Sequence, residues 1–260
     1  MGDCRVDGSL QVVLALSGGG GRGGFHLGAL QAIEEAGIEI KAISANSIGS
    51  IIACSYLSGR TPKEILSTIS SKAFSKIIRF NLLRGSIFRI DEKSPILKEL
   101  FPKKNIQNLP IPIFVNSTNF DTGELQSFSS GNILSCCLAS SAAWPILATQ
   151  TINKENYIDG GYSNNLPIKE IKTLGLPIIA INLHPLPQKK ARNFFQKLSR
   201  MMFISWQSQV IHEHNEYDLE ISDINIEKIP VLRFSQSKKA YELGYACAKE
   251  KIDNYLQSMA

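Results

Sequence analysis

The sequence has few of the features that mark secreted or membrane-spanning proteins. Its 260 residues include five cysteines, an odd number, and no C-x-x-C pair, which argues against a framework of paired disulfides. All its apolar runs are shorter than the ~18 residues of a transmembrane helix. The N-terminus shows no charged segment followed by an apolar one, the pattern of a secretory signal. We therefore expect a protein of the reducing cytoplasm.

Charge and composition limit the kinds of molecule that the protein is expected to bind and the kind of fold it can form. Lys and Arg number 28 and Asp and Glu 23, a net charge of +5 that tolerates an anionic surface but is too small to indicate nucleic-acid binding. With 43% apolar and 20% charged residues, the composition is that of an ordinary globular protein. A chain of this length can bury the core of one large domain. No linker interrupts it, and we expect residues 1–260 to form a single α/β domain.

A glycine-rich loop follows the first strongly apolar segment. Residues 10–16 form a near-continuous apolar run, the pattern of a strand buried on both faces. A helical spacing of leucines and isoleucines then extends to about Gly37. Between strand and helix lie Gly18, Gly19, Gly20, Gly21, Arg22 and Gly23. Such a loop leaves its backbone amides uncovered by side chains.

Three uses of this loop can be compared. Gly18-x-Gly20-x-x-Gly23 fits the dinucleotide-binding fingerprint, but that fingerprint requires an acidic residue at the end of the second strand, and residues 43–45 are Ile-Ser-Ala. A phosphate-binding loop would require Gly-Lys-Ser/Thr, which is not there. The third use is an oxyanion hole, in which the amides stabilise a developing negative charge. Only this use predicts a nucleophile at the end of the neighbouring strand; a purely structural turn stays open.

A serine stands where that nucleophile is expected. A short apolar run stops at small residues, and from Ile48 onward the apolar positions have helical spacing. Ala45-x-Ser47-x-Gly49 differs by one methyl group from the Gly-x-Ser-x-Gly nucleophile elbow. We expect strand, sharp turn and helix, with the Ser47 hydroxyl at the positive end of the helix.

The candidate base lies in Asp159-Gly160-Gly161. Alone, this string predicts only a turn. Together with Ser47 it supplies a carboxylate on a bend, with two glycines that allow close approach to the elbow. A serine needs a positioned base to become a nucleophile. Because a carboxylate of pKa about 4 is a weak base, proton transfer must accompany the attack.

In this order and spacing the three motifs resemble those of the patatin-like phospholipase family, and more narrowly its short bacterial members. The resemblance covers about residues 10–185, while residues 186–260, with a C-terminal strand and helices, are less distinctive. It implies a three-layer α/β/α sandwich with a mostly parallel central sheet. It also implies a hydrolase that cleaves the acyl esters of lipids through a Ser-Asp dyad, without a cofactor.

Carried over by motif position, the resemblance implies Ser47 as nucleophile, Asp159 as general base and the amides around Gly19, Gly20 and Gly21 as oxyanion hole. The sequence departs from the family at two positions. Ala45 replaces the first glycine of the elbow, so a slightly displaced elbow is expected. Gly21 stands where the family often has alanine, which should be harmless.

Three alternatives stay open. A Ser-Asp-His triad would use His184, which follows the predicted strand over residues 177–183. A lipid-binding or regulatory protein would keep the fold and lack efficient catalysis, as Ala45 suggests. Nucleotide binding through the glycine loop is the third. A metal site is not expected, because His212 and His214 fall on different faces of a helix.

Two stretches combine basic and large apolar side chains, as interfacial helices do. Residues 72–93 hold six basic and two acidic residues among bulky apolar ones, and residues 189–206 combine five basic residues with phenylalanines and methionines. We expect peripheral membrane contact through one of these stretches. The alternative is that the apolar side chains pack on the core while the charges face water.

The remaining pattern predicts further elements of an α/β domain. Helices are expected at residues 62–74, at 91–101 with Asp91 as the cap, at 131–143, at 167–173 and from Ser237 onward as its cap. Strands are expected at residues 113–119, 124–128, 149–152, 156–158, 177–183 and 231–234.

Overall fold

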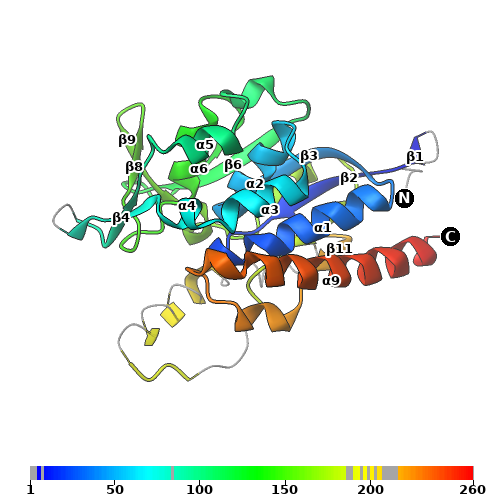
Figure 1. The fold of residues 1–260 in the computed structure, drawn as a ribbon. Coiled ribbons are helices and arrows are strands. Elements are labelled where there is room, and N and C mark those ends of the chain that lie inside the picture. The colour runs from blue at the N-terminus through cyan, green and yellow to red at the C-terminus, as the bar shows by residue number, and fades with distance from the viewer. Residues whose placement is uncertain are drawn as a thin grey trace.

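The computed structural model describes residues 5–6, 9–82, 85–185, 190–193, 196–197, 200–201, 204–206 and 216–259 (Figure 1). The strands in these residues are β1 (Arg5–Val6), β2 (Ser9–Leu16), β3 (Glu39–Asn46), β4 (Ile78–Phe80), β5 (Phe88–Ile90), β6 (Ile113–Asn119), β7 (Leu125–Phe128), β8 (Gln150–Ile152), β9 (Glu155–Asp159), β10 (Ile178–Ile181) and β11 (Leu219–Ile221). The α-helices are α1 (Gly24–Glu35), α2 (Ile48–Leu57), α3 (Pro62–Ile69), α4 (Lys72–Ser75), α5 (Pro95–Leu100), α6 (Ile133–Ser140), α7 (Lys169–Lys172) and α9 (Ser237–Ser258). Within the described ranges, no helix combines the length and hydropathy needed to cross a bilayer.

Nine of the described strands build one sheet in the order β11–β10–β2–β3–β6–β9–β8, with β1 beside β2 and β7 beside β6. The five strands from β11 to β6 run parallel to one another, and the remaining four pair antiparallel. Leu16 of β2 pairs with Ile181 of β10 and with Ala45 of β3. The central strands therefore end at one edge, which is where open α/β sheets place their sites. The expected α/β fold with a mostly parallel sheet is confirmed.

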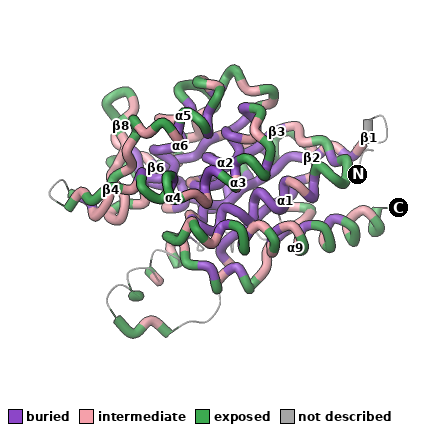
Figure 2. The backbone as a smooth tube through the Cα atoms, in the orientation of Figure 1, coloured by how far each residue is buried: buried purple, intermediate pink, exposed green. Residues whose placement is uncertain are grey.

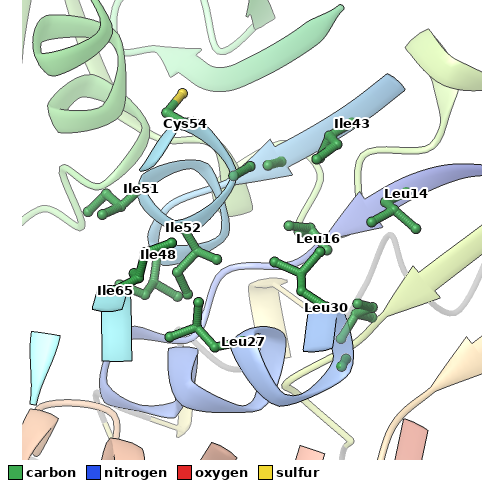
Figure 3. Close-up of a cluster of buried hydrophobic side chains, with 14 of the residues drawn as sticks. Leu14, Leu16, Leu27, Leu30, Ile43, Ile48, Ile51, Ile52, Cys54 and Ile65 are labelled. Carbon is green, nitrogen blue, oxygen red and sulfur yellow. The ribbon is translucent and has the colours of Figure 1, made fainter. Parts of the chain in front are cut away.

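Both faces of the central strands are buried, but unequally. Val12, Leu14 and Leu16 of β2 belong to the main core, which α1, α2, α3 and α9 cover (Figure 3). Val13 and Ala15 point to the opposite face, where a smaller cluster packs around α7. Figure 2 shows the buried sheet and the inner helices α1 and α2 between more exposed outer elements. This two-sided burial explains why residues 10–16 are apolar without alternation.

Helix α9 packs closely along α1 because both helices carry glycine at the contact (Figure 1). A Cβ atom at Gly24 would overlap the Ser237 carbonyl, and one at Gly28 would overlap the Tyr241 carbonyl. From the other side, a Cβ at Gly244 would overlap the Phe25 backbone. The C-terminal helix is thereby held against the helix that follows the glycine loop.

Three predicted helices have different bounds. The helix expected over residues 62–74 is two helices, α3 and α4, because Ser71 accepts a hydrogen bond from the Phe74 amide at 3.0 Å and starts a new turn. Asp91 caps no helix; α5 begins at Pro95, after Ser94. Proline at the first helical position sets that start. Helix α6 is likewise shorter than the predicted 131–143.

The strand predicted over residues 231–234 is wrong. These residues form turns and the start of a short 3₁₀ helix, Phe234–Gln236. The Val231 carbonyl accepts the amide of Gly21 at 2.5 Å rather than a bond from a neighbouring strand. Ser237 is the first residue of α9 and not its cap, and its hydroxyl donates to the Gly21 carbonyl at 3.0 Å.

Gly28→Ala tests the contact between α1 and α9. Alanine favours a helix over glycine by about 1 kcal/mol, but a Cβ here would lie 2.5 Å from the Tyr245 amide nitrogen. Overpacking costs about 1–3 kcal/mol, and because this Cβ would overlap two backbone groups we take the upper part of that range, about 2–3 kcal/mol. We therefore expect a net loss of about 1–2 kcal/mol in unfolding free energy, measured with urea. The control Gln31→Ala, on the same helix, should change it by less than about 0.5 kcal/mol. An unchanged Gly28→Ala stability would mean that α9 shifts without penalty.

Candidate active site

Ser47 lies at a sharp bend between β3 and α2. Its backbone has φ 50° and ψ −124°, a conformation that costs a non-glycine residue about 1–3 kcal/mol. The bend is held from both sides: the Ser47 amide donates to Ser140 Oγ at 2.8 Å, and Ser50 Oγ donates to the Ser47 carbonyl at 2.6 Å. The strain turns the hydroxyl away from the strand and toward the end of the sheet, as in a nucleophile elbow.

Positions 45 and 49, which flank Ser47 in the elbow, differ in whether they have room for a Cβ atom. A Cβ at Gly49 would lie 2.8 Å from the Ser17 carbonyl oxygen and 2.9 Å from that of Leu16. Ala45, in contrast, is fully buried in the main core and pairs in register with Leu16 and Val115. The elbow therefore requires glycine at position 49 and accommodates the methyl group of Ala45.

Asp159 ends β9 directly beside the elbow. Its side chain is 3% exposed, accepts a hydrogen bond from the Gly161 amide at 2.9 Å and lies beside the Ser47 hydroxyl. Burial raises the pKa of Asp159 from 3.8 to about 6, although the Ser47 hydroxyl and the Gly161 amide both lower it. Gly160 permits this approach, because a Cβ there would lie 2.5 Å from the Asn116 carbonyl oxygen.

The glycine loop passes over Ser47. A Cβ at Gly18 would lie 3.2 Å from the Ser47 Cβ. The Gly18 amide donates to Asn165 Oδ1 at 3.2 Å, and the Gly21 amide donates to the Val231 carbonyl. No described residue accepts a hydrogen bond from the amides of Gly19 or Gly20. Of the three amides expected to face an oxyanion, Gly21 is thus already engaged, and two remain.

The buried side chain of Arg22 holds this loop in place through hydrogen bonds. The side chain is buried, and its guanidinium donates to the carbonyls of Leu183 and Ile229, both at 2.9 Å. Burial lowers the pKa of Arg22 to about 10, so the group stays charged at neutral pH. Gly23 lets the loop continue into α1, because a Cβ there would lie 2.5 Å from an atom of Ile48. Arg22 therefore ties the loop to the end of β10 and to the C-terminal quarter.

The structure adds a site residue that the sequence analysis missed. Asn165 is 1% exposed and lies between the glycine loop and the Asp159 turn. Because the Gly18 amide can only donate, the oxygen of the Asn165 amide must face it, and no described group accepts from Asn165 Nδ2. No local pattern marks this residue; it follows Asp159 by six positions in a polar turn.

His184 lines the same cavity as Ser47 and contacts the glycine loop at Gly18 and Arg22. Its Nδ1 is 3.4 Å from Arg22 Nη1, and its ring lies 5.5 Å from that of Trp206. Burial and the neighbouring Arg22 hold the pKa of His184 well below 6.5. The imidazole is therefore neutral at pH 7. No hydrogen bond between His184 and either Ser47 or Asp159 is present among the described contacts. His212 and His214 lie outside the described residues.

An apolar cavity of about 440 Å³ adjoins Ser47. Its walls come from α2, α4, the β4–β5 hairpin, residues 143–147 and residues 231–234, and its polar lining includes Ser47, Asp159 and Asn165. Among the residues described, no three His, Cys, Asp or Glu side chains gather into a metal-binding group. The arrangement brings together a hydroxyl, a buried carboxylate, two amides and an apolar chamber, the kinds of group that acyl transfer needs.

Sequence comparison relates the chain to known proteins. The sequence profile of the patatin-like phospholipase family matches residues 14–171. The patatin-like phospholipase domain-containing protein ZK370.4 of Caenorhabditis elegans is 28% identical over 199 residues, which cover 72% of this chain and 15% of that protein. The lysophospholipase NTE1 of Cryptococcus neoformans is 29% identical over 204 residues, covering 73% of this chain and 12% of that protein. The chain thus spans a small part of these curated relatives.

A solved structure shows the same fold. VipD from Legionella pneumophila superposes with a TM-score of 0.54 and 16% sequence identity, over 94% of this chain and 67% of that one. The fold, the ordered motifs and the profile agree. Because the profile covers more than half of the residues, the chain belongs to the patatin-like phospholipase family.

Proposed function

We propose that the protein is a serine acyl hydrolase of lipid esters, with residues 1–260 as one hydrolase domain. Ser47 is its nucleophile and Asp159 its general base. The observation that carries this proposal is the position of the Ser47 hydroxyl beside the buried Asp159 carboxylate, whose pKa it lowers, together with two amides that no described residue engages. Family membership supports lipid esters as the substrate class.

In the proposed reaction, Ser47 Oγ attacks the ester carbonyl carbon while its proton passes to Asp159. A pKa of about 6 leaves Asp159 mostly ionised at neutral pH and makes it a stronger base than an exposed carboxylate. The negative charge that forms on the carbonyl oxygen is stabilised by the Gly19 and Gly20 amides, each such donor being worth about 2.7–4 kcal/mol. Asp159 then protonates the leaving alcohol, and water repeats the sequence on acyl-Ser47.

The cavity supports substrates with a single long acyl chain. A cavity of about 150 Å³ holds one benzene molecule, or roughly 25 Å³ per carbon. On that scale, 440 Å³ accommodates roughly 17 carbons, one fatty acyl chain rather than two. The name of one relative, a lysophospholipase, agrees with a single-chain phospholipid. We therefore propose lysophospholipids and related monoacyl esters as substrates.

A Ser-Asp-His triad with His184 has less support than the dyad. The groups that act on Asp159 are Ser47 and Gly161. His184 contacts Arg22 Nη1 at 3.4 Å through Nδ1 and also contacts the Gly18 backbone, whereas a triad would have the carboxylate at Nδ1.

We also propose peripheral contact with lipid surfaces. Within residues 72–93, Phe74 and Ile77 are buried, whereas Phe80 and Leu82 are exposed, so part of this stretch packs on the core and part faces outward. Residues 189–206, the other predicted stretch, lie partly outside the described residues, and Met201 and Ile204 in its described part are also exposed. We place the contact in residues 72–93, where exposed apolar side chains lie beside exposed arginines.

Ser47→Ala and Asp159→Asn test the catalytic assignment. Each should lower hydrolysis of a p-nitrophenyl ester on the order of 10⁴-fold, because loss of either the nucleophile or its base disables the same step. His184→Ala should lose far less activity. Labelling by a fluorophosphonate probe is measured in parallel. A wild-type protein that binds lipid without reacting with the probe would instead be a lipid-binding protein, and a larger loss in His184→Ala than in Asp159→Asn would favour the triad.

The pH dependence of activity and of stability should have opposite signs. Catalysis needs ionised Asp159, so kcat/KM should rise with pH to a plateau, with its midpoint near pH 6. The contribution of Asp159 to the free energy of unfolding is fully present below pH 3.8. It is lost as the pH rises through about 6, a decrease of about 3 kcal/mol. Asp159→Asn should therefore gain stability relative to wild type between pH 4 and pH 7.5, measured by urea unfolding. A constant difference across that range would contradict the assignment.

Ala143→Phe tests the acyl cavity. Ala143 lines this cavity, whereas Ala148 lines a neighbouring pocket. A phenyl ring at position 143 should displace at least two methylenes of a long chain, about 1.6 kcal/mol, and lower kcat/KM for a palmitoyl ester at least about tenfold. Hydrolysis of the acetyl ester should be nearly unchanged, and Ala148→Phe is the matched control. Equal losses for both esters would show that the chain binds elsewhere.

A further inference from the structure

The β4–β5 hairpin carries the most exposed apolar side chains of the described residues. Phe80 at the end of β4 is 75% exposed, and Leu82 in the following turn is 65% exposed. Phe80 contacts Phe88 edge to face, with ring centroids 4.9 Å apart, which supports the ring without covering it. In Figure 1 the hairpin projects from the end of the molecule opposite the two termini. Two large apolar groups on a projecting turn expose more apolar surface than folding explains.

Basic side chains lie on the strands behind this apolar tip. Arg79 and Arg89 face each other across the hairpin, and both are exposed. Lys76 and Lys93, also exposed, flank the hairpin in sequence. Asp91 neutralises part of this charge through an ion pair of 3.5 Å with Arg79. The net charge at the base of the hairpin is nevertheless positive, which suits an anionic surface.

Other exposed aromatic residues are connected to the same hairpin. Trp144 is 40% exposed and donates a hydrogen bond from Nε1 to the Gly85 carbonyl in the hairpin turn, at 3.2 Å. Phe120 is 43% exposed and contacts Trp144, with ring centroids 5.5 Å apart. The apolar surface therefore continues from the hairpin turn across two neighbouring loops. Tryptophan, with its apolar ring and polar N–H, is suited to the boundary between water and lipid.

The hairpin is also a wall of the acyl cavity. Ile78, Ile87, Phe88 and Ile90 line the cavity beside Ser47. Neither Phe80 nor Leu82 lines it. One face of this short element is thus apolar, lining the substrate chamber at Ile78, Phe88 and Ile90 and continuing to the exposed Phe80, while Arg79 and Arg89 lie on its other face.

We propose that the β4–β5 hairpin anchors the protein in a lipid surface rich in anionic headgroups, with Phe80 and Leu82 inserted below the headgroups and Arg79 and Arg89 at their level. This proposal rests on the proposed function, because it places the cavity wall where an acyl chain leaves the lipid. We favour a lipid surface over a protein partner because exposed basic side chains flank the exposed apolar ones. Basic residues around an apolar wedge are the pattern of interfacial binding.

Vesicle sedimentation tests the anchor. Ser47→Ala serves as the background, so that vesicles are not hydrolysed, and the vesicles contain either phosphatidylcholine alone or phosphatidylcholine with 30% phosphatidylglycerol. The background protein should bind the anionic vesicles more tightly. Adding Phe80→Ser and Leu82→Ser should weaken that binding at least about tenfold, while Arg79→Gln with Arg89→Gln should remove the preference for anionic vesicles. Met259→Ser, an equally simple change at an exposed apolar residue (41%) of the opposite end, should bind like the background.

The variants also separate this proposal from the proposed function. In the wild-type background, Phe80→Ser with Leu82→Ser should hydrolyse soluble p-nitrophenyl acetate at the wild-type rate, because neither residue lines the cavity, while hydrolysis of vesicle-bound ester falls. Unchanged vesicle binding by this double variant would overturn the anchor, as would an equal loss with Met259→Ser. Absent hydrolysis of every ester with vesicle binding that still depends on Phe80 and Leu82 would overturn the proposed function and keep the anchor.

Discussion

The close approach of three backbone segments around Ser47 is the constraint on which the rest of the structure depends. Gly18 passes directly over the Ser47 side chain, Gly49 packs on the carbonyls that end β2, and Gly160 lies against the Asn116 carbonyl. None of these contacts leaves room for a Cβ atom. Because protein interiors are close-packed, a shift of any one segment would move the hydroxyl relative to both the carboxylate and the free amides.

Burial sets the chemistry of this site and also opposes its stability. Desolvation raises the pKa of Asp159 and makes it a better base, although an ionised carboxylate in such a place destabilises the folded state. The left-handed backbone of Ser47 adds a further cost. Both persist because the core under α1 and α2 is large and continuous (Figure 3). Unfavourable conformation and unfavourable charge are thus concentrated where the proposed reaction uses them.

The local parts of the site could be predicted from the sequence, whereas the parts assembled from distant segments could not. The glycine loop, the elbow and the Asp159 turn are short strings whose residue types show what the backbone must do. The support of Gly18 by Asn165 joins positions 147 apart, and Val231 binds Gly21 through a carbonyl that every residue possesses. For the same reason the strand expected over residues 231–234 was wrong: a short, mostly apolar segment indicates extended backbone but not the group that it meets.

The C-terminal quarter makes contacts with the glycine loop that none of the sequence motifs includes. The family profile ends at residue 171, yet the glycine loop is bound by the Ile229 and Val231 carbonyls and by the Ser237 hydroxyl. Each such hydrogen bond contributes only about 0.5–1.5 kcal/mol to stability, while a misplaced oxyanion donor costs about 2.7–4 kcal/mol of transition-state stabilisation. Three such bonds together contribute about as much to stability as one misplaced donor costs the transition state, so under the proposed mechanism this segment affects both rate and folding. Since two of its three contacts use backbone oxygens, many sequences could make them, and the segment is recognised by its position in the fold rather than by its residues.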